Sequence, residues 1–158
     1  MKKTIKTSLV LAAYQVLSQA KYTKMDDADK IKVWKIARKL APVAIKFEED
    51  SKDAAEKMKP EIDGGFDNKL QKAQEFERMK RDPQADMDKA PMGAAEYEAF
   101  IKELHKYNKL VGDAVKEFAE KEVKVEFDLL SEDSFGKLMA SNEWTIGQVA
   151  TLGEMITE

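Results

Sequence analysis

Residues 31–47 read IKVWKIARKLAPVAIKF, and residues 101–118 read IKELHKYNKLVGDAVKEF. In both stretches apolar side chains recur at alternating steps of three and four, the spacing that gives a helix one apolar face. Such a seam is typical of a helix that packs lengthwise on another helix. The first seam comprises Val33, Ile36, Leu40, Val43 and Phe47. The second comprises Ile101, Leu104, Asn108, Val111, Val115 and Phe118.

The two seams predict a mainly α fold built around a long antiparallel helical hairpin. Its helices should span residues 27–59 and 93–121, within one domain that takes in all 158 residues. Pro42 lies inside the first helix and removes one backbone hydrogen bond, but the seam keeps its phase across the proline. We therefore expect one kinked helix, with Pro42 away from the seam on the convex side. The helix near the N-terminus, the small sheet and the two short C-terminal helices should cover the base of the hairpin, and Phe118 should lie close to Val33.

Residues 60–92 contain breaks that interrupt the helical pattern. Pro60 and the adjacent Gly64 and Gly65 mark the first of them. We expect this segment to be an elaborated tip of the hairpin that carries a modest helix over residues 67–81.

Apolar and charged residues alternate over residues 123–129, the period of a half-buried strand. Its expected partner is the short β-like segment at the start of the chain. Lys3 and Lys6 could then face Glu126 and Asp128 across the two-stranded sheet.

Capping signals mark the starts of three shorter helices. Thr7 or Ser8 can cap a helix near the N-terminus. Ser131 can cap the first of two short C-terminal helices. Thr145 and Gln148 form a capping box for the second.

Charge is distributed unevenly although the net charge is only −3. Residues 1–46 carry eleven Lys or Arg and three Asp, whereas residues 122–158 carry two Lys and eight Asp or Glu. The basic start and the acidic end can attract each other within one fold, which is the interpretation we favour. A basic face that meets an anionic partner is the alternative.

The sequence contains no constellation that indicates catalysis, a metal or a cofactor. It has no cysteine, and His105 is its only histidine, so thiolate chemistry and histidine-based sites are excluded. The carboxylates do not match the spacing of a calcium loop, and no glycine-rich phosphate loop is present. We therefore predict no catalytic residue, no metal ligand and no cofactor, and a protein that is not an enzyme.

Two groups of residues are candidates for binding. Asn108 is either a boundary residue with a partly solvated amide or a buried polar residue that fixes helix register or partner number. Basic residues within 24–46 form a possible anion-binding face, although they are spread around the helix and Trp34 is expected on its apolar side. That face comprises Lys32, Lys35, Arg38, Lys39 and Lys46.

The N-terminus has two interpretations. Lys2 and Lys3 precede a moderately apolar run over residues 8–20, which could be a secretion signal. Polar residues interrupt the run, so we favour an amphipathic helix and a protein that stays in the cytoplasm or the virion. No apolar run approaches the length of about 20 residues that a membrane span needs, and no membrane partner is expected.

The order of elements resembles that of small uncharacterised helical-hairpin proteins of tailed bacteriophages and prophages. The resemblance lies in the sequence EVKVEFD at 122–128, LSED at 130–133, and the capped final helix. It implies a bacterial or phage-encoded protein acting in the host cell or in the virion, and it carries no catalytic residue with it.

The sequence thus predicts a non-enzymatic structural or interaction protein. It would display the helical hairpin to a protein partner or to a second copy of itself. The alternative is a nucleic-acid-associated accessory protein that uses the basic face of residues 24–46.

Overall fold

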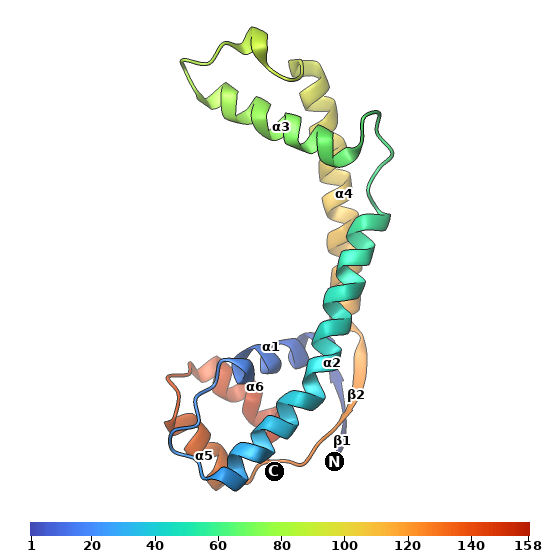
Figure 1. Ribbon diagram of the computed structural model, residues 1–158. Helices are drawn as coiled ribbons and strands as arrows, with labels where there is room; N and C mark the ends of the chain where they lie inside the picture. The colour runs from blue at the N-terminus through green and yellow to red at the C-terminus, as the bar shows by residue number, and fades with distance from the viewer. The chain divides into compact units, whose positions relative to one another are not determined.

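The computed structural model describes residues 1–158, and Figure 1 shows its helices and strands. The fold is mainly α with one small sheet, as the sequence predicts. In chain order the elements are β1 (Lys2–Lys6), α1 (Thr7–Ser18), α2 (Asp27–Lys57), α3 (Phe66–Arg81), a 3₁₀ turn (Met87–Lys89), α4 (Ala94–Glu120), β2 (Glu122–Glu126), α5 (Glu132–Ala140) and α6 (Ile146–Ile156).

The chain divides into two compact units. Unit 1 comprises Met1–Asp50 and Lys116–Glu158, and unit 2 comprises Ser51–Val115. The helices α2 and α4 each contribute residues to both units. Unit 2 therefore contains the predicted tip at 60–92 together with the helical segments that flank it.

The sheet of unit 1 pairs β1 with β2 in antiparallel orientation, which confirms the predicted strand pair. Its register places Lys2 opposite Glu126 and Lys3 opposite Val125, so the expected facing of Lys3 and Glu126 is wrong by one residue. The strand begins at Lys2, and a shift of one residue turns each side chain to the other face of the sheet. Lys6 forms its ion pair with Glu120 instead, at 2.7 Å.

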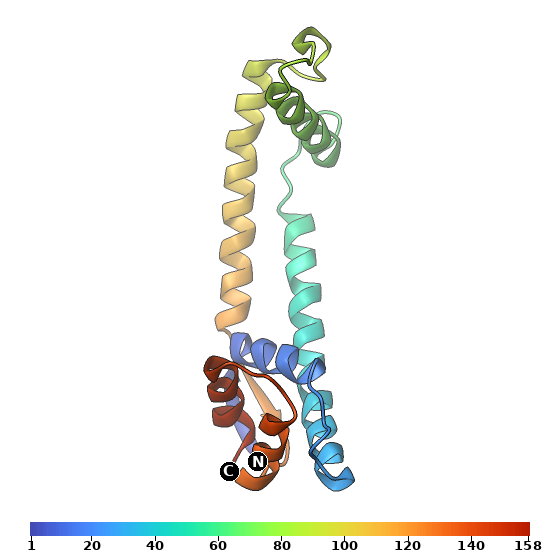
Figure 2. The same ribbon diagram turned by 90° about the vertical axis from the view of Figure 1, so that its left-hand side faces the viewer.

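The core of unit 1 lies between its sheet and its helices. In both views α1 lies beside α6 (Figure 1, Figure 2). Each large side chain buried there contributes about 1.5–3 kcal/mol relative to an exposed one. The largest fully buried side chains are Val10, Leu17, Val33, Ile36, Leu40, Leu130, Leu138, Leu152, Met155 and Ile156.

The first apolar seam belongs mainly to this core. Val33, Ile36 and Leu40 are fully buried in it, and their neighbours come from α1, α5, α6 and the sheet rather than from the second seam. Phe118 is not part of this core, and the prediction that it lies close to Val33 is wrong. It instead lines a hollow with Phe47.

The helix α2 runs without a break through Pro42, which confirms one helix rather than two. Pro42 is exposed, as expected for a residue away from the seam, and it also lines a hollow together with Val43 and Phe47. Five residues turn a helix by about 500°, which places position 42 about 140° around the helix from the seam position 47.

The helix starts agree with the predicted caps in two cases out of three. The Ser131 hydroxyl accepts a hydrogen bond from the backbone of α5, and Thr145 and Gln148 form both bonds of the capping box. The prediction for α1 is wrong, because Lys6 is its N-cap residue and provides no side-chain bond. The Thr7 hydroxyl donates to the Lys121 carbonyl at 2.7 Å and thereby ties α1 to the end of α4.

Unit 2 is held together by aromatic contacts between α3 and α4. The rings of Phe66 and Phe100 lie 5.8 Å apart, and those of Phe76 and Tyr97 lie 4.5 Å apart. The Tyr107 hydroxyl donates to a backbone carbonyl at the end of α2, that of Ala55, at 2.8 Å. The helix α3 thus confirms the helix predicted over residues 67–81. Its apolar face is buried in a second core, which belongs to unit 2.

Candidate interaction surface

The solvent face of α2 carries large apolar side chains. Ile31, Trp34 and Ile45 are 52%, 55% and 54% exposed. Helical periodicity places them on the side opposite the buried Val33, Ile36 and Leu40. We call Ile31, Trp34, Arg38 and Ile45 the outer stripe.

The exposure of Trp34 shows that the prediction for this residue, which was expected on the apolar side of the helix, is wrong. Trp34 follows the buried Val33 by one residue, and one residue turns a helix by about 100°. It precedes the buried Ile36 by two residues, so it has turned away from the core in both directions. The core face of α2 is narrower than its apolar composition suggests.

A row of lysines runs alongside the outer stripe, one residue further along the chain at each step. All four side chains are exposed, and their spacing places them on one side of the outer stripe. The expectation that basic residues are spread around the helix is therefore wrong for these four. We call them the basic stripe; they are Lys32, Lys35, Lys39 and Lys46.

The basic stripe is largely unneutralised. Lys46 forms an ion pair with Asp50 at 2.7 Å, and that hydrogen bond raises the pKa of Lys46 above its ordinary value. No carboxylate pairs with Lys32, Lys35 or Lys39. The stripe therefore gives this side of α2 a positive potential.

Arg38 and Trp34 form a cation–π contact on the outer stripe. The guanidinium carbon lies 5.2 Å from the centre of the indole ring. At an exposed site such a contact contributes about 0.5–1 kcal/mol. It restrains Trp34 before any partner binds, so less side-chain entropy is lost on binding.

A small apolar hollow adjoins the basic stripe within unit 1. It has a volume of about 300 Å³, and Pro42, Phe47, Phe118 and Val123 form much of its wall. Lys46 also lines it, so the hollow begins where the basic stripe ends. It is large enough to receive an apolar side chain of a partner.

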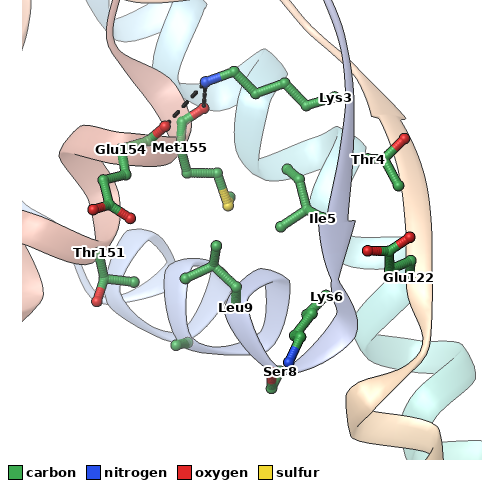
Figure 3. A pocket seen from close by; sticks show the side chains of 11 residues that line it. Lys3, Thr4, Ile5, Lys6, Ser8, Leu9, Glu122, Thr151, Glu154 and Met155 are labelled. Carbon is green, nitrogen blue, oxygen red and sulfur yellow. Dashed lines mark hydrogen bonds between the residues drawn. The ribbon is translucent and has the colours of Figure 1, made fainter.

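A larger hollow of about 770 Å³ lies between β1, α1 and α6. Figure 3 shows the apolar side chains of Ile5, Leu9 and Met155 directed toward it. The Lys3 side chain lies along the edge of this hollow, and its ammonium group donates to the Glu154 and Met155 carbonyls at 3.0 and 2.9 Å (Figure 3). Lys3 thus satisfies backbone acceptors in the last turn of α6, which is a structural role.

The second seam lies partly exposed. Ile101, Leu104, Val111 and Val115 are each half-buried. Asn108 is exposed, so the chain by itself does not bury its amide, and a role in partner number stays a prediction.

The structure brings no cluster of acidic or histidine side chains together as a metal site. His105 lies exposed on α4. No helix is both long enough and apolar enough to cross a membrane. The sequence signal for the apolar part of the surface is the recurrence of Ile-Lys, Trp-Lys, Arg-Lys and Ile-Lys at helical spacing over residues 31–46.

Comparison with protein-family models gave no match for this chain, and neither the curated proteins nor the solved structures gave one. The resemblance to phage and prophage proteins stays a prediction.

Proposed function

We propose that this chain is a non-enzymatic interaction protein that binds a protein partner through the outer and basic stripes of α2. One observation carries the proposal: Ile31, Trp34 and Ile45 are each more than half exposed on one face of one helix. Apolar side chains gathered on an exposed face are typical of interaction sites, whereas single ones are ordinary. The resemblance to phage and prophage proteins adds the proposal that the partner is a host or virion protein.

Trp34 and Arg38 give this surface the composition of an interface centre. Tryptophan and arginine are the residues most enriched among those that dominate binding energy. The basic stripe would form one side of the rim, where charge guides association more than it adds affinity.

Site-specific photo-crosslinking tests the proposal. A benzoylphenylalanine is placed at position 45, which leaves Trp34 intact, and the full chain is irradiated in an extract of its source cells. We expect protein adducts that disappear when Trp34→Ser is added. The same photo-crosslinker at position 146 is the control, since Ile146 is 89% exposed but lies on α6. Equal adducts at both positions, or adducts that ignore Trp34→Ser, would contradict the proposal.

Nucleic-acid binding is the second candidate, and the exposure of Trp34 beside the basic stripe favours it. Lysines can neutralise phosphates, and an indole can stack on an unpaired base. A gel shift with duplex and single-stranded DNA and RNA separates the two functions. Binding that Trp34→Ser weakens and that falls steeply with salt would replace our proposal with this one.

A further inference from the structure

We propose that the outer and basic stripes bind an acidic amphipathic helix of another protein. This inference rests on the proposed function and names the chemistry of the partner. Three features of α2 carry it: the spacing of the outer stripe, the one-sided position of the basic stripe, and the place of Arg38 between apolar neighbours.

The spacing of the outer stripe matches that of a helix–helix seam. Ile31, Trp34, Arg38 and Ile45 are separated by three, four and seven residues, and Ala41 occupies the intervening seam position. A helix with the same repeat can insert its side chains between these positions along the whole stripe. From residue 31 to residue 45 the stripe extends about 21 Å, which corresponds to about two heptads of a partner helix.

The basic stripe fixes the charge of that partner. Lys32, Lys35 and Lys39 follow one side of the outer stripe without a carboxylate partner. The other side is mostly neutral, with Ala37 and Ala44. Glutamates or aspartates along one flank of the bound helix would therefore face the lysines, and this asymmetry would fix the helix orientation.

Arg38 adds specificity at the centre of the stripe. Its guanidinium stacks on Trp34 and occupies a seam position that is otherwise apolar. Its donors would stay unpaired against a purely apolar helix, and that loss of hydration disfavours such partners. A partner with one carboxylate in its own seam, opposite Arg38, would satisfy them.

A second copy of this chain fits the surface poorly. In an antiparallel two-fold pair of α2 helices, each basic stripe would face the basic stripe of the other copy. Like charges placed opposite each other disfavour such a pair. Light scattering after gel filtration should therefore give the mass of one chain, and a dimer that Lys35→Glu strengthens would overturn the inference.

Designed peptides provide the direct test with the full chain. The probe is a helix of about three heptads with leucine at the seam, glutamate on both flanks and one seam glutamate. Its counterparts are the same helix with lysine on the flanks and an acidic peptide of identical composition in scrambled order. Fluorescence anisotropy should show binding of the acidic helix alone, and weaker binding as salt rises from about 50 to about 300 mM.

Variants of the chain locate the binding. Trp34→Ser should weaken binding of the acidic helix by about tenfold or more, the loss typical of one central interface residue. Lys35→Glu combined with Lys39→Glu should abolish that binding and allow the basic helix to bind. Lys109→Glu is the matched control, because Lys109 is exposed on α4, and it should change nothing.

Several results would overturn the inference. Equal binding of the scrambled peptide would show that the surface attracts negative charge without recognising an amphipathic helix. Trp34-dependent binding to anionic vesicles or to duplex DNA, with no binding of the acidic helix, would assign a different partner. If the peptide fails but Trp34-dependent crosslinks at position 45 still form, the acidic-helix inference fails while the proposed function stands. If both fail, the proposed function fails as well.

Discussion

Removing the hydroxyl of Ser134 should destabilise unit 1 strongly for so small a change. Asp29, at the start of α2, is the only charged residue that is buried, with 7% exposure. The Ser134 hydroxyl, itself in a residue only 5% exposed, donates to the Asp29 carboxylate at 2.7 Å. The Ser131 hydroxyl lies 2.9 Å from that of Ser134 and completes a short chain of hydrogen bonds between α2 and α5.

The magnitude follows from the burial of the carboxylate. A hydrogen bond to a charged group contributes about 1.5–3 kcal/mol, and its loss leaves a buried carboxylate oxygen without that donor. Ser134→Ala should therefore lower the free energy of unfolding by about 1.5–3 kcal/mol. For a chain of this length that corresponds to a fall in Tm of roughly 3–12 °C.

Urea unfolding followed by circular dichroism measures the effect, and a double-mutant cycle assigns it. Asp29→Asn and Ser134→Ala should couple by about 1 kcal/mol or more, because each removes one end of the same bond. Ser18→Ala is the matched control, since that hydroxyl is exposed and bonds only within its own helix, and it should stay within about 0.5 kcal/mol. Additive effects, or a Ser134→Ala variant as stable as the unchanged chain, would show that this hydrogen bond does not stabilise unit 1.

Three further predictions concern other contacts. Lys3→Met should lower the free energy of unfolding, measured by urea titration, by about 1 kcal/mol, because two carbonyls in the last turn of α6 lose their donor. Lys2→Met is the control and should have no effect, since the Lys2 ammonium forms only an exposed ion pair at 3.8 Å. Tyr97→Phe should raise the pKa of Glu77, because the hydrogen bond from the tyrosine hydroxyl is the main cause of the lowered pKa of that carboxyl. NMR titration of the Glu77 carboxyl from neutral to acid pH measures the pKa, and an unchanged midpoint would contradict the prediction. Thr145→Ala should cost about 1 kcal/mol and speed amide hydrogen exchange in the first turn of α6, since it removes the capping box.

Local sequence signals determined most of the elements, and long-range partners were harder to predict. Ser131 and Thr145 cap the helices that they were expected to cap, because a cap depends on residues within one turn. The facing of Lys3 and Glu126 was missed because register depends on where the strand starts, and a shift of one residue exchanges the two faces. The hydrogen bond from Lys3 to the end of α6 joins residues near opposite ends of the sequence, so no pattern of residue spacing could predict it.

The partner of the first seam was predicted only in part, for a related reason. Periodicity says that Val33, Ile36 and Leu40 are buried, but any apolar surface of matching shape can cover them. The covering side chains come from α1, α5, α6 and the sheet. The hairpin interpretation also assigned one seam to the other, because both have the three-four spacing of helices that pack lengthwise.

The basic part of the candidate surface on α2 was named from the sequence, but its apolar part was overlooked because Trp34 was assigned to the buried side of the helix. Trp34 lies between the buried Val33 and Ile36 in sequence, yet its side chain is more than half exposed. Core packing does not require a large apolar side chain on the solvent side, and leaving one there adds an aggregation hazard without adding to the core. The same helix therefore carries one stripe that stabilises unit 1 and a second that the fold does not use. Substitutions that remove binding but leave unfolding unchanged should consequently fall on the outer stripe, and those that lower stability should fall on the buried seam.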